Sequence, residues 1–293
     1  MGLCCCCYGK NPDALLSYGS EEREIEFNKY ISSNDDSLKI IEEKYNILIY
    51  IYLLEFTNYL ETFSSNTATV PFQGKFKNLF SSKDEFLNTK INIDEFQSFL
   101  ENKIFKINSV YEICGSNENL QSTFIDNFRE IFKCLELKLN QNYNEKKRDR
   151  MKKKHILALG MIFCLSTNIG KIKLLFDLFA DEEKKFKKSE ELNEFLLTMF
   201  ISASYALVNS LYKLGKNHDD INKISNDEMA KLLNASELKD NQNLLEKFNE
   251  TFFEDKESLT YDEFKNKFKN REKGFGWIFS SKGIRFMLEK YNV

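Results

Sequence analysis

The chain has 293 residues, of which 42% are hydrophobic and 14% are aromatic. This length and composition are sufficient for one large core or two ordinary ones, and they exclude a chain that is disordered throughout. The 42 basic and 45 acidic residues give a formal net charge of −3, which provides no general attraction to nucleic acid. Only two prolines interrupt the chain, so we expect a mostly helical, all-α protein.

The amino terminus carries acceptors for two kinds of lipid. Four consecutive cysteines follow Met1, Gly2 and Leu3: Cys4, Cys5, Cys6 and Cys7. Removal of the initiator methionine exposes Gly2 for myristoylation, and adjacent thiols are acceptors for palmitoylation. Because one myristoyl chain gives only reversible binding of about 10⁴ M⁻¹, stable anchoring needs the second lipid. We therefore predict a lipoprotein held on the cytoplasmic face of a membrane by its acyl chains.

Other uses of the cysteine run fit less well. Zinc sites usually space their thiolates as C-x₂₋₄-C, and four adjacent cysteines do not easily converge on one ion. A disulfide framework is disfavoured because Cys114, Cys134 and Cys164 are scattered, with no secretory segment before them. The one departure from the usual myristoylation pattern is Cys6, which stands where Ser or Thr is expected.

Apolar residues at helical spacing predict a series of helices after a short tail. We place the tail at 1–20, an N-terminal helical region at 21–145 and a C-terminal region at 146–293. Helices are expected within 21–61 and over 75–82, 93–101, 120–139, 156–166, 170–179, 190–214, 227–233, 241–252 and 261–268. Strand signals are nearly absent. No apolar window approaches the roughly 20 residues of a transmembrane helix.

A basic run connects the two helical regions. Residues 146–154 contain seven basic side chains and one acidic side chain. Such a run either contacts an anionic lipid surface, where each Lys or Arg contributes about 1 kcal/mol, or forms a solvated helix or linker face. No aromatic residue is interleaved as a stacking platform for bases, which argues against a nucleic-acid partner.

Residues 84–95 fit the spacing of a 12-residue calcium-binding loop. Such a loop needs side-chain oxygens at positions 1, 3, 5 and 9, a sharp turn at position 6 and a bidentate Glu at position 12. The candidate ligands are Asp84, Asn88, Asn92 and Glu95. Ile91 fills the apolar position 8, whereas Phe86 at position 3 and Thr89 at position 6 depart from the pattern.

Three windows in the second half share this skeleton at near-equal spacing, as repeated helix-loop-helix units would. They begin at residues 180, 217 and 252. The first has lost most of its ligands, and the third begins with Phe252, which cannot bind a cation. The candidate ligands of the second window are Asn217, Asp219, Ser225 and Glu228.

These windows resemble the EF-hand superfamily, and the acylated start resembles the arrangement of neuronal calcium sensors and calcineurin-B-like proteins. The likeness covers 165–270 and the hairpin at 76–100. It implies EF-hand-like helix-loop-helix pairs, additional N-terminal helices and a groove for a helix of a partner protein. Because no window has every ligand position filled or a Gly at position 6, most loops are expected to be structural, and calcium binding is expected at most at the two ligand sets above.

An apolar stretch near the carboxyl end is a candidate for a groove-filling helix. Its residues are Phe275, Trp277, Ile278, Phe279, Ile284, Phe286, Met287 and Leu288. We expect them to pack in the core, with the groove of this chain or of another chain as the alternatives.

Catalytic motifs are not found. The two histidines, His155 and His218, do not belong to a recognisable nucleophile motif, and phosphate-binding, dinucleotide-binding, HExxH and paired CxxC patterns are missing from the sequence. We therefore interpret the chain as a non-catalytic, membrane-associated adaptor or weak calcium-responsive regulator. The alternative is a structural scaffold of a cytoskeletal, ciliary or cortical assembly that binds no calcium.

Overall fold

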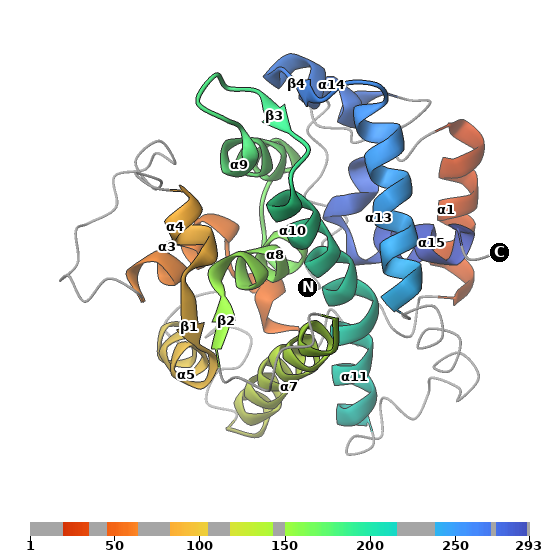
Figure 1. Ribbon diagram of the computed structural model, residues 1–293. Helices are drawn as coiled ribbons and strands as arrows, with labels where there is room; N and C mark the ends of the chain where they lie inside the picture. The colour runs from red at the N-terminus through yellow and green to blue at the C-terminus, as the bar shows by residue number, and fades with distance from the viewer. Residues whose placement is uncertain are drawn as a thin grey trace.

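The computed structural model describes residues 20–34, 46–63, 83–104, 118–142, 150–215, 238–270 and 274–291. These residues form helices and four short strands (Figure 1). The prediction of a mostly helical, all-α protein is therefore confirmed. None of the described helices is both long enough and apolar enough to span a membrane.

The elements follow one another along the chain as two sets. The first set is α1 (Glu21–Asn34), the 3₁₀ helix η3 (Ile47–Tyr50), α3 (Leu53–Thr62), α4 (Lys83–Asn88), β1 (Lys90–Asn92), α5 (Ile93–Ile104) and α7 (Glu118–Asn142). The second set is β2 (Arg150–Lys152), α8 (Lys153–Phe163), α9 (Asn168–Phe179), β3 (Phe186–Lys187), α10 (Glu190–Ile201), the π-helical turn η5 (Ser202–Ala206), α11 (Leu207–Gly215), α13 (Leu238–Phe253), β4 (Ser258–Leu259), α14 (Tyr261–Lys269), the 3₁₀ helix η6 (Gly276–Phe279) and α15 (Ser281–Tyr291).

Most predicted helices overlap observed ones. Within 21–61 the structure places α1, η3 and α3, and the predicted helix 190–214 corresponds to α10, η5 and α11 in succession. The predicted helices at 75–82 and 227–233 lie outside the described residues. The strands were not predicted, because two or three residues are too few to display an alternating apolar pattern.

Two antiparallel ribbons organise the helices. β1 pairs with β2, and Ile91 lies opposite Met151. β3 pairs with β4, and Phe186 lies opposite Leu259. These four side chains are buried, and each strand stands between two helices. We call α4–β1–α5 with α7–β2–α8 the first pair, and α9–β3–α10 with α13–β4–α14 the second pair.

The ribbon of the first pair joins residues on both sides of the boundary that we placed between 145 and 146. The division of the chain into two helical regions stays a prediction.

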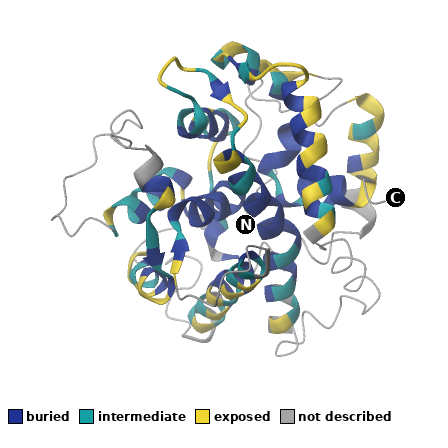
Figure 2. Ribbon diagram, in the orientation of Figure 1, coloured by how far each residue is buried: buried dark blue, intermediate teal, exposed yellow. Residues whose placement is uncertain are grey.

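Helices α8 and α10 pack against each other in the middle of the described structure (Figure 2). Every residue of α8 is buried, and this includes Gly160, which faces the ring of Phe56 in α3. A Cβ at position 160 would lie 2.5 Å from the Cδ1 and Cε1 atoms of Phe56. Glycine thus permits α3 to approach α8 more closely than any other residue would.

The carboxyl-terminal stretch belongs to the core of its own chain, as predicted. All eight apolar residues of that stretch are buried. Helix α15 packs on η5, η6, α13 and α1, and Arg285 donates a hydrogen bond of 3.3 Å to the carbonyl oxygen of Ala203 in the π-helical turn. The rings of Phe286 and Phe27 of α1 meet edge to face, with 5.4 Å between their centroids.

Replacement of Gly160 by alanine should destabilise the fold. Glycine to alanine inside a helix normally stabilises by about 1 kcal/mol, but here the added methyl overlaps a fully buried ring, and overpacking costs about 1–3 kcal/mol. Urea unfolding of the two proteins measures the difference.

Gly170→Ala in α9 is the matched control. Its Cβ would meet Ser166 Oγ at 2.7 Å and Thr167 Oγ1 at 3.1 Å. Both side chains are exposed and can move, but Thr167 Oγ1 accepts from the amide of residue 170 as the cap of α9, and loss of a cap costs about 1 kcal/mol. The gain of about 1 kcal/mol from alanine in a helix offsets that loss, so we expect this variant to keep its stability. Equal unfolding midpoints for the two variants would contradict the close approach of α3 to α8.

Candidate functional site

The first turn of α8 carries three consecutive basic side chains in the protein interior. Lys153, Lys154 and His155 are 3%, 1% and 5% exposed. Both interpretations of the basic run, a solvated face and a lipid contact, are therefore wrong for Lys153 and Lys154. Residues 146–149 of the run lie outside the described residues. Because a buried charge without a partner is strongly unfavourable, the interior has to supply counter-charges.

The ammonium group of Lys153 is stabilised by groups from the elements packed beside α8. Its Nζ lies 4.6 Å from the centre of the Phe86 ring, a cation–π arrangement. Burial lowers the pKa of Lys153 to about 8, against the opposing effect of the nearby Glu61 carboxylate. Its amide donates to the carbonyl oxygen of Thr89 at 2.9 Å, so this residue also fixes α8 to the segment before β1.

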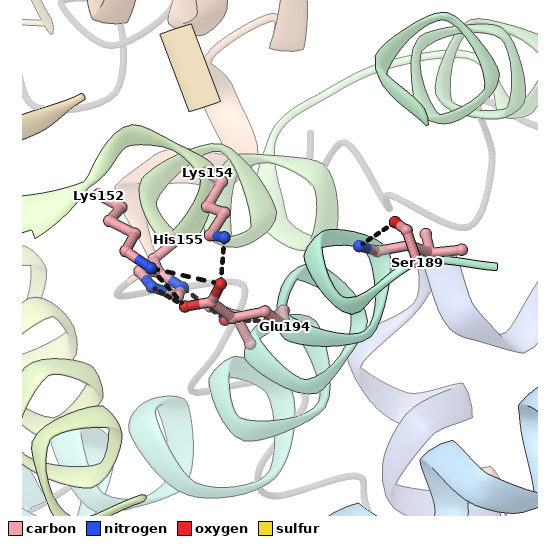
Figure 3. Close-up of polar contacts among 7 residues, drawn as sticks. Lys152, Lys154, His155, Ser189 and Glu194 are labelled. Atoms are coloured by element: carbon pink, nitrogen blue, oxygen red, sulfur yellow. Dashed lines mark hydrogen bonds and ion pairs between the residues drawn. The ribbon is translucent and has the colours of Figure 1, made fainter. Parts of the chain in front are cut away.

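Glu194 of α10 supplies the counter-charge for the remaining basic side chains (Figure 3). Its Oε1 lies 3.1 Å from Lys152 Nζ and 3.3 Å from His155 Nε2, and its Oε2 contacts Lys154 Nζ. One turn along α10, Thr198 Oγ1 lies 2.8 Å from His155 Nδ1. We call Lys152, Lys154, His155 and Glu194 the buried ion-pair cluster.

The charge states of the cluster follow from burial and hydrogen bonding. Burial alone would raise the pKa of the Glu194 carboxyl, but the hydrogen bonds from His155 and Lys154 hold that pKa far below its ordinary value. Burial lowers the pKa of His155, against the opposing effect of the Glu194 carboxylate. The Thr198 hydroxyl donates its proton to the backbone carbonyl oxygen of Glu194 at 2.7 Å, and the same hydroxyl oxygen lies 2.8 Å from His155 Nδ1.

This arrangement serves stability better than chemistry. The carboxylate is ionised and held by three donors, and both nitrogens of His155 contact other side chains, so neither group is poised to exchange a proton with a substrate. The described cysteines are buried, and burial raises the pKa of Cys134 to about 11 and that of Cys164 further. Because α8 belongs to the first pair and α10 to the second, the cluster joins the two pairs.

The loop between α9 and β3 holds its own carboxylates with lysines. Asp181 Oδ2 lies 2.7 Å from Lys187 Nζ, and Asp181 Oδ1 accepts from the Lys185 amide at 2.9 Å. Phe186 pairs with Leu259, which is position 8 of its own window, so the predicted start of this window at residue 180 is one residue too late. With Phe186 as position 8, Lys184, whose φ is 59°, stands at position 6, where a calcium loop turns sharply and usually has glycine.

The loop between α13 and β4 also pairs a lysine with a carboxylate. Glu263 Oε1 lies 2.6 Å from Lys256 Nζ, and Glu263 Oε2 accepts from the amide and hydroxyl of Thr260, both at 2.9 Å. The hydrogen bond from Lys256, followed by those from Thr260, lowers the pKa of Glu263 to about 2. In both loops of the second pair, a lysine ammonium thus lies against a carboxylate.

The structure places the predicted ligands of the 84–95 window in different elements. Asp84 and Asn88 belong to α4. The Asn92 side-chain oxygen accepts from the Glu95 amide at 3.1 Å, so it caps the start of α5. Calcium binding at these residues stays a prediction.

The other predicted site residues lie outside the described residues: Asn217, Asp219, Ser225 and Glu228, and the lipid acceptors Gly2, Cys4, Cys5, Cys6 and Cys7. In the part of the chain that the structure describes, no group of three or more His, Cys, Asp or Glu side chains is placed to hold a metal ion.

Sequence reasoning missed Glu194, although a signal for it was present. The basic run leads directly into the apolar stretch 156–163, which has no polar face. A helix that is apolar all round is buried, so the basic residues of its first turn are drawn inside and require a carboxylate. The sequence alone does not identify which of the many acidic residues provides it.

Glu194→Gln should strongly destabilise the protein. The substitution leaves Lys154 buried without its counter-charge, and breaking a buried ion pair from one side costs about 3–5 kcal/mol. The free energy of unfolding in urea at pH 7 measures this loss.

A double variant, Glu194→Met with Lys154→Met, is the control, because removing both charges recovers much of the stability. The acid dependence gives a second readout. Because the pKa of Glu194 is lowered by folding, its ionised form stabilises the folded protein fully above pH 4.5, the ordinary pKa of the group. This contribution to the free energy of unfolding is lost as the pH falls below that value. The Glu194→Gln variant should not show this part of the acid dependence. A single variant as stable as the wild type would contradict the role of the cluster.

Comparisons with known proteins do not assign the chain to a family. No protein-family model matches the chain, and neither does any curated protein or solved structure.

Proposed function

We propose that the chain is a lipid-anchored, non-catalytic adaptor built on two EF-hand-like pairs. The observation that carries this proposal is the register of the two ribbons. Ile91 and Leu259, the position 8 residues of two predicted loops, each lie opposite an apolar residue, Met151 and Phe186. Paired helix-loop-helix units are expected to join their loops in this way at position 8.

The register also suggests a partner loop that sequence reasoning did not identify. If Met151 is position 8, then Lys152 is at position 9 and His155 at position 12. Neither side chain is suited to bind calcium at a position where the ion needs an oxygen ligand. This supports a first pair in which one loop is purely structural.

The lysines in the second pair support an adaptor whose shape does not depend on calcium. Lys187 and Lys256 provide positive charge within the loops themselves, so the pair keeps its ribbon without a bound ion. Any calcium response is then confined to the windows at 84–95 and 217–228. The same observation favours the second candidate function, a scaffold that binds no calcium.

A groove between α5 and α7 provides a surface for a protein partner. It encloses about 320 Å³. Its lining is mostly polar: Ile93, Asp94, Gln97, Ser98, Arg129, Lys133 and Glu136. Because α15 is already packed in the core, we propose that a partner binds on this surface of the first pair.

Gly2→Ala should move the protein from the membrane fraction to the soluble fraction of cells. Without the myristoyl chain the amino terminus loses one of the two lipids needed for stable residence. Fractionation followed by immunoblotting measures the distribution, and Gly9→Ala is the matched control. Unchanged pelleting of Gly2→Ala would contradict the anchor. Pelleting that resists both detergent and high salt would favour the scaffold.

Calorimetry with calcium tests the proposed confinement of the calcium response. We expect any heat of binding to disappear in Glu95→Gln or Glu228→Gln, because the bidentate Glu at position 12 is essential to such a loop. We expect Asp181→Asn and Glu263→Gln to leave the heat unchanged, because lysines already occupy these carboxylates.

Two outcomes would change this view. Loss of the heat in Glu263→Gln would show that calcium displaces Lys256, and the proposed calcium-independent second pair would be rejected. A full-length protein that gives no heat at millimolar calcium would establish the calcium-free scaffold instead.

A further inference from the structure

The helical segment from residue 190 to residue 215 holds one residue more in η5 than an α-helical turn would. The amide of Leu207 donates to the carbonyl oxygen of Ser202, five residues back. In an α-helix this amide would donate to Ala203, four residues back. The carbonyl of Ala203 therefore loses its α-helical donor, although the residue is fully buried and an unpaired carbonyl in the interior is unfavourable.

Helix α15 supplies the donor that the π turn removes. Arg285 Nη1 donates to the Ala203 carbonyl oxygen at 3.3 Å, and Arg285 is itself 4% exposed. Because the donor is charged, this hydrogen bond is stronger than one between neutral groups. The last described helix thus stabilises an irregular turn in the middle of an earlier one.

Two serines weaken the α-helical alternative at this place. The hydroxyl of Ser202 donates to the Thr198 carbonyl at 2.7 Å, and that of Ser204 donates to the Phe200 carbonyl at 2.8 Å. Such bonds to the carbonyl four residues back often bend a helix and slightly destabilise it. The serines therefore favour an irregular turn here, and Arg285 completes its hydrogen bonding.

The contacts of α11 with α7 of the first pair depend on this turn. The ring of Tyr205 in η5 has its centre 4.6 Å from Lys138 Nζ of α7. Farther along, Lys213 pairs with Glu130, and Lys213 Nζ lies 3.8 Å from Cys134 Sγ. If the turn became α-helical, the extra residue would rotate α11 by about 100° and move it by about 1.5 Å along its axis. These contacts would then be lost.

We propose that the docking of α15 sets the register of α11 on α7, through Arg285 and the π turn. With Arg285 in place, the π turn and the contacts with α7 persist together. Without this donor, Leu207 donates to Ala203, the segment becomes α-helical throughout, and α11 leaves its register. A change at the carboxyl-terminal helix is transmitted to the first pair in this way.

Thiol labelling of the full-length protein tests this link. Arg285→Met removes the donor and keeps a long side chain in the core. Cys134 of α7 is 3% exposed, and Cys164 at the end of α8 is 2% exposed. In the variant, the rate at which iodoacetamide labels Cys134, divided by the rate for Cys164, should rise about tenfold, because one hydrogen bond from a charged group is lost. Mass spectrometry of the two peptides measures both rates.

The ratio separates the link from a general loss of stability. If Arg285→Met only loosens the whole fold, both thiols become more reactive by the same factor. A ratio equal to that of the wild type would therefore overturn the proposal.

A deletion provides a second test. Removal of Ala203 takes out the extra residue, so the segment becomes α-helical while α11 keeps its place on α7. Deletion of Ala158 is the matched control, because this alanine is also fully buried but belongs to the α-helix α8. There a deletion rotates the residues that follow by about 100°. We expect cooperative unfolding in urea for the first deletion only.

Arg285 should also lose its role once the extra residue is gone. In the Ala203 deletion, Arg285→Met should leave the ratio of the labelling rates unchanged. Two results would overturn the proposal: the same unfolding behaviour in both deletions, or a ratio that still rises about tenfold when Arg285→Met is combined with the deletion of Ala203.

Discussion

The carboxylate of Glu194 is the group on which the centre of this protein depends. Helix α8 is buried along its whole length, yet it begins with two lysines and a histidine. Such a helix is tolerated in the interior only because one carboxylate from α10 meets Lys152, Lys154 and His155 together. The apolar surface of α8 drives the burial, and Glu194 makes it possible. The contact between the first and second pairs is set by both.

The second pair shows the same principle at its surface. Asp181 and Glu263 form ion pairs with Lys187 and Lys256, and hydrogen bonds from these lysines lower the pKa of both carboxyl groups. A lysine side chain is held covalently, so these two charge pairs do not depend on the concentration of an ion in solution. This supports the proposal of an adaptor that presents one constant surface.

The sequence predicted the helices well and the polar contacts poorly. Helices such as α7 and α14 have a long apolar stripe or a capping residue such as Thr260, and both are local signals. The ribbons were not predicted, because Phe186 and Leu259 are far apart in the chain and each strand is very short. The role of Glu194 was not predicted either, because its partners are distant in the chain and become its neighbours only when the two pairs dock. The burial of the carboxyl-terminal stretch was predicted, because its high apolar content admits few other positions.

Helix α15 has a further consequence for the way in which the chain folds during synthesis. It covers η5 and α13 and follows every other described element along the chain. At about 5–20 residues per second, η5 leaves the ribosome roughly 4–17 s before α15 does. During this interval the apolar side chains of η5 and α13 lack their cover, so the nascent protein is vulnerable to aggregation. Helix α15 is thus required to complete the core. Its removal would expose the apolar surface of η5 and α13 to non-specific association, and would not open a groove for a specific partner.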